Sequence, residues 1–490
     1  MWLDSSTFAQ QRWATLSLAA AAVLVGILLA ELPVAWAAIG LVTVVLVGAT
    51  LIEPLVGVGV VLVLGPTKPF TDFYVPALPL DLGQIALVIT LGAWFLHAAR
   101  RGKLTVPRSP LTVPLLIYVG TGLLSLLNAL SLGYALTELI KWVQLLVMMW
   151  LVLLETRHDP SRLRLVVGLV LGAAAVQAAI GVWQFGLRDI GPEHYEILGG
   201  RFYRAYGSFE QPNPYGGFLG LTLPLALGIT AGALERWIGP LLRRERDLRE
   251  ALNSDLLRLA GLSVLCALLL AALVMSWSRG AWLGFAVAAA GVLFAWPKRT
   301  WIGILLVIAG MLAVTVTLQF DLLPASLEAR LTGFTQDFTT LDVRGVDIND
   351  TNYSVLERVA HWQAAWEMAR YHPWLGVGIG NYEPVYPAFA LLNWPQPLGH
   401  AHNIYLNTLA ETGVIGLLAY VAFWAIVLWL TWRVTRSGES WRRFLAIGLF
   451  GTWVHLSAHS VLDKLYVANL HLHIGVLLGV VSVLALWEQE

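Results

Sequence analysis

The chain has 490 residues, of which 58% are hydrophobic and 13% are charged, and its formal net charge at pH 7 is zero. Soluble globular proteins carry about 25% charged residues, so this composition excludes an ordinary soluble fold. The zero net charge gives no electrostatic reason to expect a nucleic-acid partner, and the single cysteine, Cys266, excludes an internal disulfide. We therefore predict an all-α, polytopic helical membrane protein with about 12–14 transmembrane helices, each needing about 20 apolar residues.

Apolar segments long enough to approach or cross a bilayer follow one another along most of the chain. They lie near residues 14–30, 33–49, 51–65, 81–99, 110–130, 134–155, 161–187, 214–234, 257–275, 280–296, 300–320, 403–432, 441–461 and 468–487. The third segment is short and contains Glu53 and Pro54, so a re-entrant segment is the alternative to a span. The segments group into N-terminal transmembrane segments at 1–100, a transmembrane core at 101–320 with an external loop at 188–213, an external loop region at 321–402, and C-terminal transmembrane segments at 403–490.

Lysine and arginine residues are concentrated in alternate loops, which predicts that these loops face the cytoplasm. The loop at residues 100–108 is strongly basic, as are later loops on the same side. The short loops on the opposite side hold few basic residues. We therefore expect both termini in the cytoplasm and the loops 188–213, 276–280 and 321–402 on the outer side.

The external loop at 321–402 is the longest polar stretch, and connections of this length are usually functional. Ser354 and Glu357 have the spacing of a capping box, which is typical of a helix start. Hydrophobic residues then recur at helical spacing over 355–369. The loop is therefore predicted to contain an amphipathic helix, followed by a glycine-rich turn at 376–380.

Four polar clusters interrupt the apolar sequence, and all four are predicted on the outer side. They are RAYGSFEQPNPYGGFLG at 204–220, SWSRGAWLG at 276–284, a helix followed by HPWLGVGIGNY at 354–382, and HAHNIYLNTLAETGVIG at 400–416. Each contains an arginine or a histidine, which a membrane segment normally avoids. Because all four clusters are predicted on the same side of the membrane, we expect them to form an anion-binding site that opens outward, with a histidine beside it.

Arg279 is the most informative arginine because it begins an apolar run, where its charge is unfavourable unless it faces a cavity or a partner. The competing interpretation is that its side chain extends to the outer headgroups. Arg204 lies in an aromatic loop and could be simply solvated, whereas Arg358 on the external helix could pair with a nearby glutamate. Together the three could bind a diphosphate, since guanidinium groups bind phosphate bidentately and stay charged.

His400 and His402 directly precede the span that begins near Asn403. An imidazole can act as a general base near neutral pH, and a structural histidine is the competing interpretation. Glu411 is either a partner for this histidine or a buried structural carboxylate. On another span, Glu138 and Lys141 are three residues apart and are expected to pair structurally.

Two patterns could hold a metal ion, but a simpler interpretation is favoured for each. His455 and His459 are four residues apart on a predicted helix, and Asp347 and Asp350 lie in the external loop. Neither pattern has the full ligand set of a zinc site, so packed histidines and a solvated loop are expected instead. The chain also contains no GxGxxG motif and no P-loop. We therefore expect no metal and no other cofactor.

The clusters resemble those of the O-antigen ligase and O-antigen polymerase superfamily of bacterial envelope glycosyltransferases. The resemblance rests on RAYGSFEQPNPYGGFL, SWSRGAWLG, SVLERVAHWQAAWEMARYHPWLGVGIGNY and HAHNIYLNTLAETGVIGLL, within residues 200–420. It implies a multi-pass protein of the bacterial inner membrane, in contact with membrane lipids, whose outward-facing site moves a glycan from undecaprenyl diphosphate to a glycan or lipid acceptor. A polysaccharide polymerase, a small-anion transporter for an ion such as bicarbonate, and a non-catalytic scaffold are the alternatives. Acceptor identity and oligomeric state stay open.

The resemblance also implies roles for individual residues. Arg279 and Arg204 match the positions that hold the donor diphosphate, and Arg358 is a weaker match because Arg330 in the same loop could take that role. His402 matches the histidine that activates the acceptor hydroxyl, with His400 as the alternative. An in-line displacement would invert the anomeric centre, and the arginines would replace the metal ion that other lipid-linked glycosyltransferases use.

Overall fold

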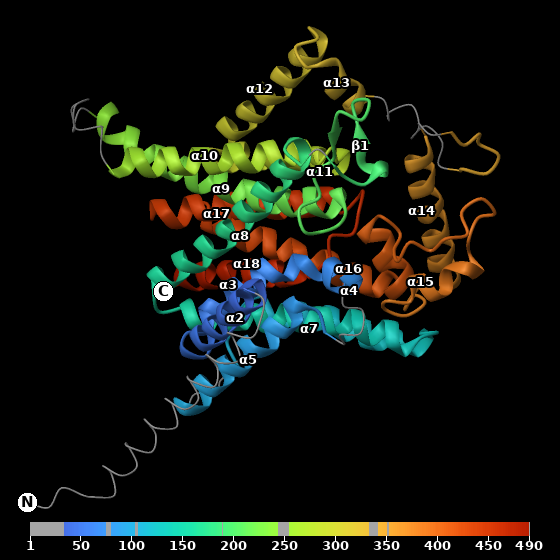
Figure 1. Ribbon diagram of the computed structural model, residues 1–490, viewed down its shortest axis with the longest axis horizontal. Coiled ribbons are helices and arrows are strands. Elements are labelled where there is room, and N and C mark those ends of the chain that lie inside the picture. The colour runs from blue at the N-terminus through green and yellow to red at the C-terminus, as the bar shows by residue number, and fades with distance from the viewer. Residues whose placement is uncertain are drawn as a thin grey trace, which may run out of the picture. The chain divides into compact units, whose positions relative to one another are not determined.

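The computed structural model describes residues 34–74, 80–102, 106–188, 190–243, 254–332, 342–349 and 352–489. Helices dominate these residues, and the only strands among them are β1 (Glu196–Ile197) and β2 (Phe202–Tyr203), which pair antiparallel (Figure 1). The predicted all-α class is therefore confirmed. The helices are α2 (Val34–Ile52), α3 (Pro54–Leu64), α4 (Lys68–Tyr74), α5 (Leu82–Arg100), α6 (Thr112–Ser125), α7 (Leu132–Thr156), α8 (Pro160–Gly186), α9 (Pro212–Leu242), α10 (Ser254–Met275), α11 (Arg279–Ala295), α12 (Thr300–Gln319), α13 (Ala325–Thr332), α14 (Tyr353–Tyr371), α15 (Tyr382–Val385), α16 (Ile404–Val434), α17 (Ser440–His459) and α18 (Leu470–Trp487).

Many of these helices have the length and apolar character of transmembrane segments. Within the described residues, nine helical stretches are long and apolar enough to cross a membrane, and three shorter apolar helices accompany them. The predicted third segment is part of a longer helical stretch, Pro54–Phe73, that continues through a turn into α4. The predicted run at 14–30 lies outside the described residues. The protein is a polytopic helical membrane protein, as its composition predicts.

The chain divides into two compact units. In the smaller unit, Gly57 lies against Thr50 and Thr90, and a side chain at this position would collide with both. Small residues of this kind let membrane helices approach closely. The candidate site residues all belong to the larger unit. The smaller unit comprises Met1–Val60 and Ala86–Leu104, and the larger comprises Val61–Ile85 and Thr105–Glu490.

Glycines also bring together the central helices of the larger unit. A Cβ at Gly448 of α17 would lie 2.8 Å from the Cα atom of Leu225 in α9, so the two backbones nearly touch. Gly475 and Gly479 of α18 lie equally close to α7, against Leu145 and Val152. Close backbone contact replaces the hydrophobic effect as the force that associates helices in a bilayer. Figure 1 shows α9, α17 and α18 running alongside one another in this unit.

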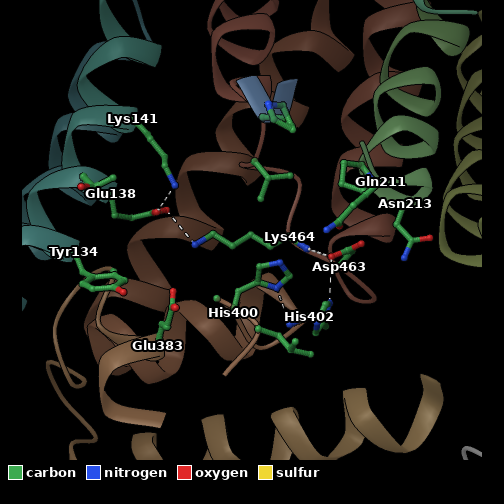
Figure 2. A pocket seen from close by; sticks show the side chains of 18 of the residues that line it. Tyr134, Glu138, Lys141, Gln211, Asn213, Glu383, His400, His402, Asp463 and Lys464 are labelled. Carbon is green, nitrogen blue, oxygen red and sulfur yellow. Dashed lines mark hydrogen bonds and ion pairs between the residues drawn. The ribbon is translucent and has the colours of Figure 1, made fainter. Parts of the chain in front are cut away.

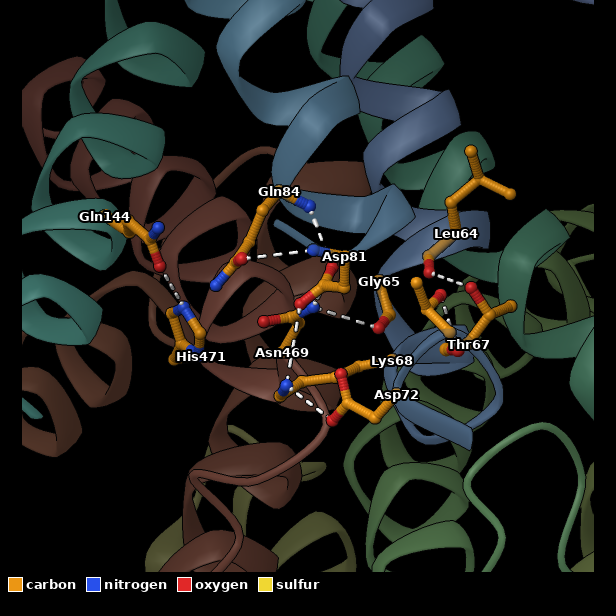
Figure 3. Close-up of polar contacts among 11 residues, drawn as sticks. Leu64, Gly65, Thr67, Lys68, Asp72, Asp81, Gln84, Gln144, Asn469 and His471 are labelled. Atoms are coloured by element: carbon orange, nitrogen blue, oxygen red, sulfur yellow. Dashed lines mark hydrogen bonds and ion pairs between the residues drawn. The ribbon is translucent and has the colours of Figure 1, made fainter. Parts of the chain in front are cut away.

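The turn that leads into α18 is held by polar contacts (Figure 3). Asn469 has a left-handed backbone, with φ of 57°, and its Nδ2 donates to the carbonyl of Gly65 at 3.2 Å and to Oδ1 of Asp81 at 2.9 Å. Lys68 places its Nζ 3.9 Å from Oδ2 of Asp81 and 2.7 Å from Oδ2 of Asp72. These contacts anchor one end of the loop between α17 and α18, which borders the candidate site.

A second break positions the segment that follows the predicted external helix. Gly413 interrupts α16 with φ of 67°, and a side chain there would collide with Trp374. The backbone N–H of Val377 donates to the carbonyl of Ala410 at 2.9 Å. The predicted glycine-rich turn therefore packs directly into the broken helix.

The predicted external helix is α14, and its buried face includes Val355 and Val359. The predicted capping box is wrong, because the N-cap residue is Asn352 and its side chain makes no capping bond. The Ser354 hydroxyl instead accepts a hydrogen bond from Arg279. Figure 1 shows α13, α14, α15 and β1 at one end of the helices of the larger unit, with the C-terminus towards the other end.

Candidate active site

Four arginines line one small cavity. Arg204, Arg279, Arg330 and Arg358 border a volume of about 130 Å³. They come from four separate segments: the chain after β2, the first residue of α11, α13 and α14. The structure therefore brings together both arginines of the membrane-side clusters and both candidates from the external loop.

The break between α10 and α11 holds two of these arginines. Trp277 lies in the break and has φ of 54°, a value that residues other than glycine rarely adopt. Arg204 donates from Nε to the carbonyl of Ser276 at 3.1 Å, and Arg330 donates from Nη2 to the carbonyl of Trp277 at 3.1 Å. The SWSR segment thus supplies the backbone acceptors that orient arginines from two distant parts of the chain.

The start of α14 holds the other two. Arg279 donates from Nη2 to Oγ of Ser354 at 3.1 Å, and Arg358 donates from Nη1 to the carbonyl of Ser354 at 2.8 Å. Arg204 also donates from Nη2 to Oδ1 of Asn213 at 3.2 Å. The Ser354 and Asn213 acceptors are neutral, so these particular bonds orient the guanidinium groups without cancelling their charge.

Burial and repulsion between positive charges lower the pKa of two arginines that lie outside the membrane-spanning helices. Burial, followed by the charges of Arg358 and Arg279, lowers the pKa of Arg204 to about 10. Burial, followed by the charges of the other three arginines, lowers the pKa of Arg330 to about 9. Both groups still carry a proton at neutral pH, so each adds a positive charge to the cavity. The N-terminus of α11 adds the positive end of a helix dipole, and together they suit a multiply charged anion such as a diphosphate.

A cavity of about 1060 Å³ adjoins the arginine cavity. Asn213, Ser354, Arg358 and Asp463 line both cavities, so the two cavities are direct neighbours. Figure 2 shows His400, His402 and Lys464 in the middle of the large cavity. On one side of them are Gln211 and Asn213, and on the other are Tyr134, Glu138 and Lys141.

His402 lies beside a carboxylate from the loop between α17 and α18. Its Nδ1 is 3.5 Å from Oδ1 of Asp463. Its backbone has φ of 51°, and its N–H donates to Nδ1 of His400 at 3.1 Å. Burial alone would raise the pKa of Asp463, but the contact with His402 and the nearby imidazoles hold it below its usual range. An ionised Asp463 can therefore orient the His402 ring, whose buried Nε2 bonds to no other described residue.

Two neutral histidines surround His402. Burial, with a further contribution from His402, lowers the pKa of His400 well below its usual value. The ring of His361 on α14 lies 5.8 Å from that of His402, and burial lowers the pKa of His361 to about 4. The His361 Nδ1 and the Tyr382 hydroxyl share a hydrogen bond of 2.8 Å. His402 is thus the member of this group that has both a charged partner and access to the large cavity.

Glu411 is not the partner of His402. It accepts the backbone N–H of Tyr382 at 3.3 Å, so it has the buried structural role that was the alternative prediction. Glu138 lies 2.8 Å from Nζ of Lys141, as predicted, and 3.2 Å from Nζ of Lys464. Burial alone would lower the pKa of Lys464, but the charges of Glu138 and Glu411 hold it above its usual value. These lysines and glutamates form a charge-compensated network beside the large cavity.

The candidate base also belongs to a group with metal-ligand spacing. Among the described residues, the ligand atoms of His400, His402 and Asp463 lie within 4.8 Å of one another. Zinc ligands lie about 2 Å from the ion, so these side chains would have to move closer together to hold one. This is the place in the described chain where a divalent ion would compete with His402.

The two metal patterns considered from the sequence fall elsewhere. The rings of His455 and His459 are 5.3 Å apart, and His455 fills the space left by Gly220 of α9 and Gly284 of α11. This packing matches the simpler interpretation of the pair. Asp350 lies outside the described residues, so the pair with Asp347 stays a prediction.

Sequence reasoning missed the roles of Asp463, Lys464 and Asn213. Asp463 and Lys464 lie in a short loop between the predicted segments 441–461 and 468–487, so the alternation of sides could have placed them on the same side as His402. Asn213 lies inside the RAYGSFEQPNPYGG cluster but was hidden among its proline and glycine residues. His361 on α14 is also buried in the site, which its sequence position does not reveal.

The fold and the site define a polytopic helical membrane protein with a positively charged arginine cavity beside a histidine–carboxylate pair. Residues 264–421 match the family model described as O-antigen ligase. The chain is 32% identical over 93 residues to a protein named O-antigen ligase from Pseudomonas aeruginosa, a match that covers 19% of this chain and 20% of that protein. The resemblance seen in the sequence is confirmed for this region, since residues 264–421 match an O-antigen ligase model.

The matched region includes much of the site but not all of it. It contains Arg279, both external-loop arginines and the two histidines of the HAHN segment. Arg204 and Asp463 lie outside it, and they join the site only through the contacts described above.

Proposed function

We propose that this chain is a membrane glycosyltransferase that moves a glycan from an undecaprenyl-diphosphate donor to an acceptor hydroxyl at the outer face of the bacterial inner membrane. The observation that carries the proposal is the arginine cavity, which adjoins a larger cavity lined by His402. The diphosphate of the donor would occupy the arginine cavity, and its glycan would extend into the larger one.

The arginines would stabilise the leaving group. As the bond between the anomeric carbon and the diphosphate breaks, negative charge grows on the diphosphate oxygens. Positive groups that are already in place stabilise such charge strongly, because they need not reorganise during the reaction. Arg204 and Arg279 are suited to this role, since hydrogen bonds to Ser276, Asn213 and Ser354 hold their guanidinium groups in position.

His402 would act as the general base. The acceptor hydroxyl would lose its proton to Nε2 of His402 as its oxygen attacks the anomeric carbon, and the diphosphate would leave on the opposite side. Asp463, 3.5 Å from Nδ1, would stabilise the imidazolium that forms. This single displacement inverts the anomeric centre and needs no metal ion.

The size of the site supports a glycan over a small anion. Bicarbonate would not need a cavity of about 1060 Å³ beside the arginines. A polymerase would use the same chemistry and would differ only in its acceptor, which would be a second lipid-linked glycan.

The distribution of basic residues supports an outward-facing site with both termini in the cytoplasm. Leu392, in the segment between α15 and α16, is 96% exposed and is a suitable labelling position. A Leu392→Cys variant that also carries Cys266→Ser should react with an impermeant maleimide in intact spheroplasts. Labelling that requires permeabilised membranes would place the site in the cytoplasm and overturn the orientation.

The activity can be tested with the purified chain in nanodiscs, an undecaprenyl-diphosphate-linked oligosaccharide and a bacterial glycolipid extract. We expect free undecaprenyl diphosphate and a heavier glycolipid to appear in equal amounts, as measured by mass spectrometry. Growth of the glycan on its own lipid carrier would instead identify a polymerase. Bicarbonate movement across proteoliposomes, without any glycan transfer, would favour the transporter.

A further inference from the structure

The end of the large cavity opposite Asn213, which also lines the arginine cavity, has a distinct set of polar residues. Tyr134, Glu138, Lys141 and Glu383 line this end, and Figure 2 shows them across His400 and Lys464 from Asn213. In an in-line displacement the acceptor enters on the side opposite the leaving group. If the diphosphate occupies the arginine cavity, the acceptor therefore approaches from this end.

The two carboxylates at this end differ in the number of hydrogen-bond and ion-pair partners that they have within the protein. Glu138 is bound by Lys141 at 2.8 Å and by Lys464 at 3.2 Å, so both its oxygens are engaged. Glu383, in the short helix α15, is only partly buried and its side chain makes no hydrogen bond or ion pair with any other described residue. Figure 2 shows its carboxylate pointing into the cavity below Glu138 and beside His400. Glu383 is therefore a fixed acceptor of hydrogen bonds that lacks a donor.

The backbone around Glu383 is held rigidly against the start of α7. Asn381 accepts the N–H of Ser131 through Oδ1 at 2.7 Å and donates from Nδ2 to the carbonyl of Ser131 at 3.1 Å. Gly380 packs against the carbonyl of Tyr134, where a Cβ would lie only 2.6 Å from the oxygen. This clamp fixes Glu383 relative to the Tyr134 side chain, which is 46% exposed.

We propose that Glu383 and Tyr134 select the acceptor, and that they recognise a sugar ring with neighbouring hydroxyl groups. This inference rests on the proposed glycosyl transfer. A carboxylate can accept two hydrogen bonds at once, which suits two adjacent hydroxyls, and the Tyr134 ring offers an apolar surface to one face of the sugar. A third hydroxyl of the same sugar would then lie near His402 and attack the donor. A serine or threonine side chain has one hydroxyl, which the attack consumes, so it leaves Glu383 without a donor.

The test is acceptor kinetics with an undecaprenyl-diphosphate-linked oligosaccharide as donor. The acceptors are p-nitrophenyl mannoside, galactoside and glucoside, and a hexapeptide that contains one serine. The wild-type chain should glycosylate at least one hexoside and leave the peptide unmodified. Glu383→Gln keeps the side-chain size but removes the charge, so kcat/KM for the hexoside should fall about tenfold or more, the scale expected for a lost hydrogen bond to a charged group. The KM for the donor should stay within about twofold, because the arginines bind the diphosphate.

Two controls separate recognition from folding. Glu367→Gln removes a carboxylate that pairs with Arg370 at 3.1 Å on the same external region but does not line the cavity, and it should behave as wild type. Tyr134→Ala should lower kcat/KM for the hexoside, as Glu383→Gln does. Tyr134→Phe keeps the ring and should retain most of the activity. If Glu383→Gln does not fold, the two Tyr134 variants still test whether this end of the cavity selects the acceptor.

The possible outcomes are distinct. A wild-type chain that neither binds nor cleaves the donor would overturn the proposed function. A wild-type chain that cleaves the donor but accepts the peptide in place of every hexoside would overturn only the choice of a sugar acceptor. Wild-type kinetics in folded Glu383→Gln and Tyr134→Ala would show that these residues do not select the acceptor.

Discussion

Two clusters of cations border the same pair of cavities, and they differ in the groups that bind them. Arg204 and Arg330 of the arginine cluster donate to the carbonyls of Ser276 and Trp277, which are neutral. In the lysine cluster, Lys141 and Lys464 both lie against Glu138. A carboxylate therefore compensates the lysines within the protein, whereas neutral acceptors orient these two arginines without neutralising them. The contrast indicates that the arginine cavity is the one prepared for an anionic ligand and the lysine cluster is part of the framework.

The side chains themselves suit these two roles. A guanidinium group is planar, stays charged and offers several donors in a fixed arrangement, so it binds a phosphate through two bonds. An ammonium group is a compact point charge that pairs well with a single carboxylate. The comparison therefore predicts that charge alone will not replace an arginine of the cavity.

The largest effect on transfer is expected from Arg279→Lys. The variant keeps a positive charge at the start of α11 but loses the planar group that bonds to Ser354. Losing one preorganised donor to a developing anion typically lowers turnover by about 10²–10³-fold, and we expect an effect of this size. Single-turnover transfer should be measured on protein whose monodispersity and melting temperature match the wild type. Normal transfer by the folded variant would show that the arginine cluster does not bind the diphosphate in the way that the comparison with the lysine cluster predicts.

A somewhat smaller effect is expected at His402. His402→Ala should lower turnover by about 10²-fold, the usual scale for one positioned acid–base group. Donor binding should change little, because the arginines hold the diphosphate. His400→Ala should be milder, since His400 contacts the backbone of His402 through Nδ1. If the His400 variant is inactive and the His402 variant is not, the base is His400. If both transfer normally, the arginine cavity carries the reaction without a histidine.

Glu138→Gln tests the other side of the comparison. The substitution removes the carboxylate that Lys141 and Lys464 share and leaves Glu411 as the remaining charge near the buried Lys464; removing one partner of a buried ion pair destabilises a protein by about 3–5 kcal/mol. We expect a clear fall in melting temperature but donor binding within about threefold of wild type for the folded fraction. Glu367→Gln, which removes a half-exposed carboxylate on α14, is the matched control. Wild-type stability with a loss of donor binding would show that the lysine cluster, too, holds the anion.

The sequence was sufficient for the class of protein and for the composition of the arginine cluster. An arginine that begins an apolar run, such as Arg279, is unfavourable enough in a membrane to demand a polar partner, so the residue type itself carries the signal. Asp463 could not be assigned in this way. A carboxylate in a short loop is ordinary in composition, and its partner His402 lies on another loop, so only the packing of α16, α17 and α18 brings them together.

Local patterns were informative only where no tertiary contact competed with them. Ser354 and Glu357 have the spacing of a capping box, but the Ser354 hydroxyl accepts a bond from Arg279 instead. A capping bond contributes about 1 kcal/mol, which a bond to a charged group can exceed. The break at Gly413 is likewise invisible in an apolar run, since it depends on the close approach of Trp374.

The smallest effect is expected from removing metal ions. The arginines and the N-terminus of α11 already supply the positive charge that a metal ion would bring to the diphosphate, so excess EDTA should leave the rate of transfer unchanged. The spacing of His400, His402 and Asp463 makes the opposite experiment equally informative. Zinc bound there would occupy the ring that must accept the proton, so added zinc should inhibit and EDTA should restore the original rate. Magnesium prefers oxygen ligands and should do neither. Activity that disappears with EDTA and returns with magnesium or manganese would mean that a metal ion shares the diphosphate with the arginines. The arginine cavity would then be an incomplete anion site, and its contrast with the compensated lysines would lose its meaning.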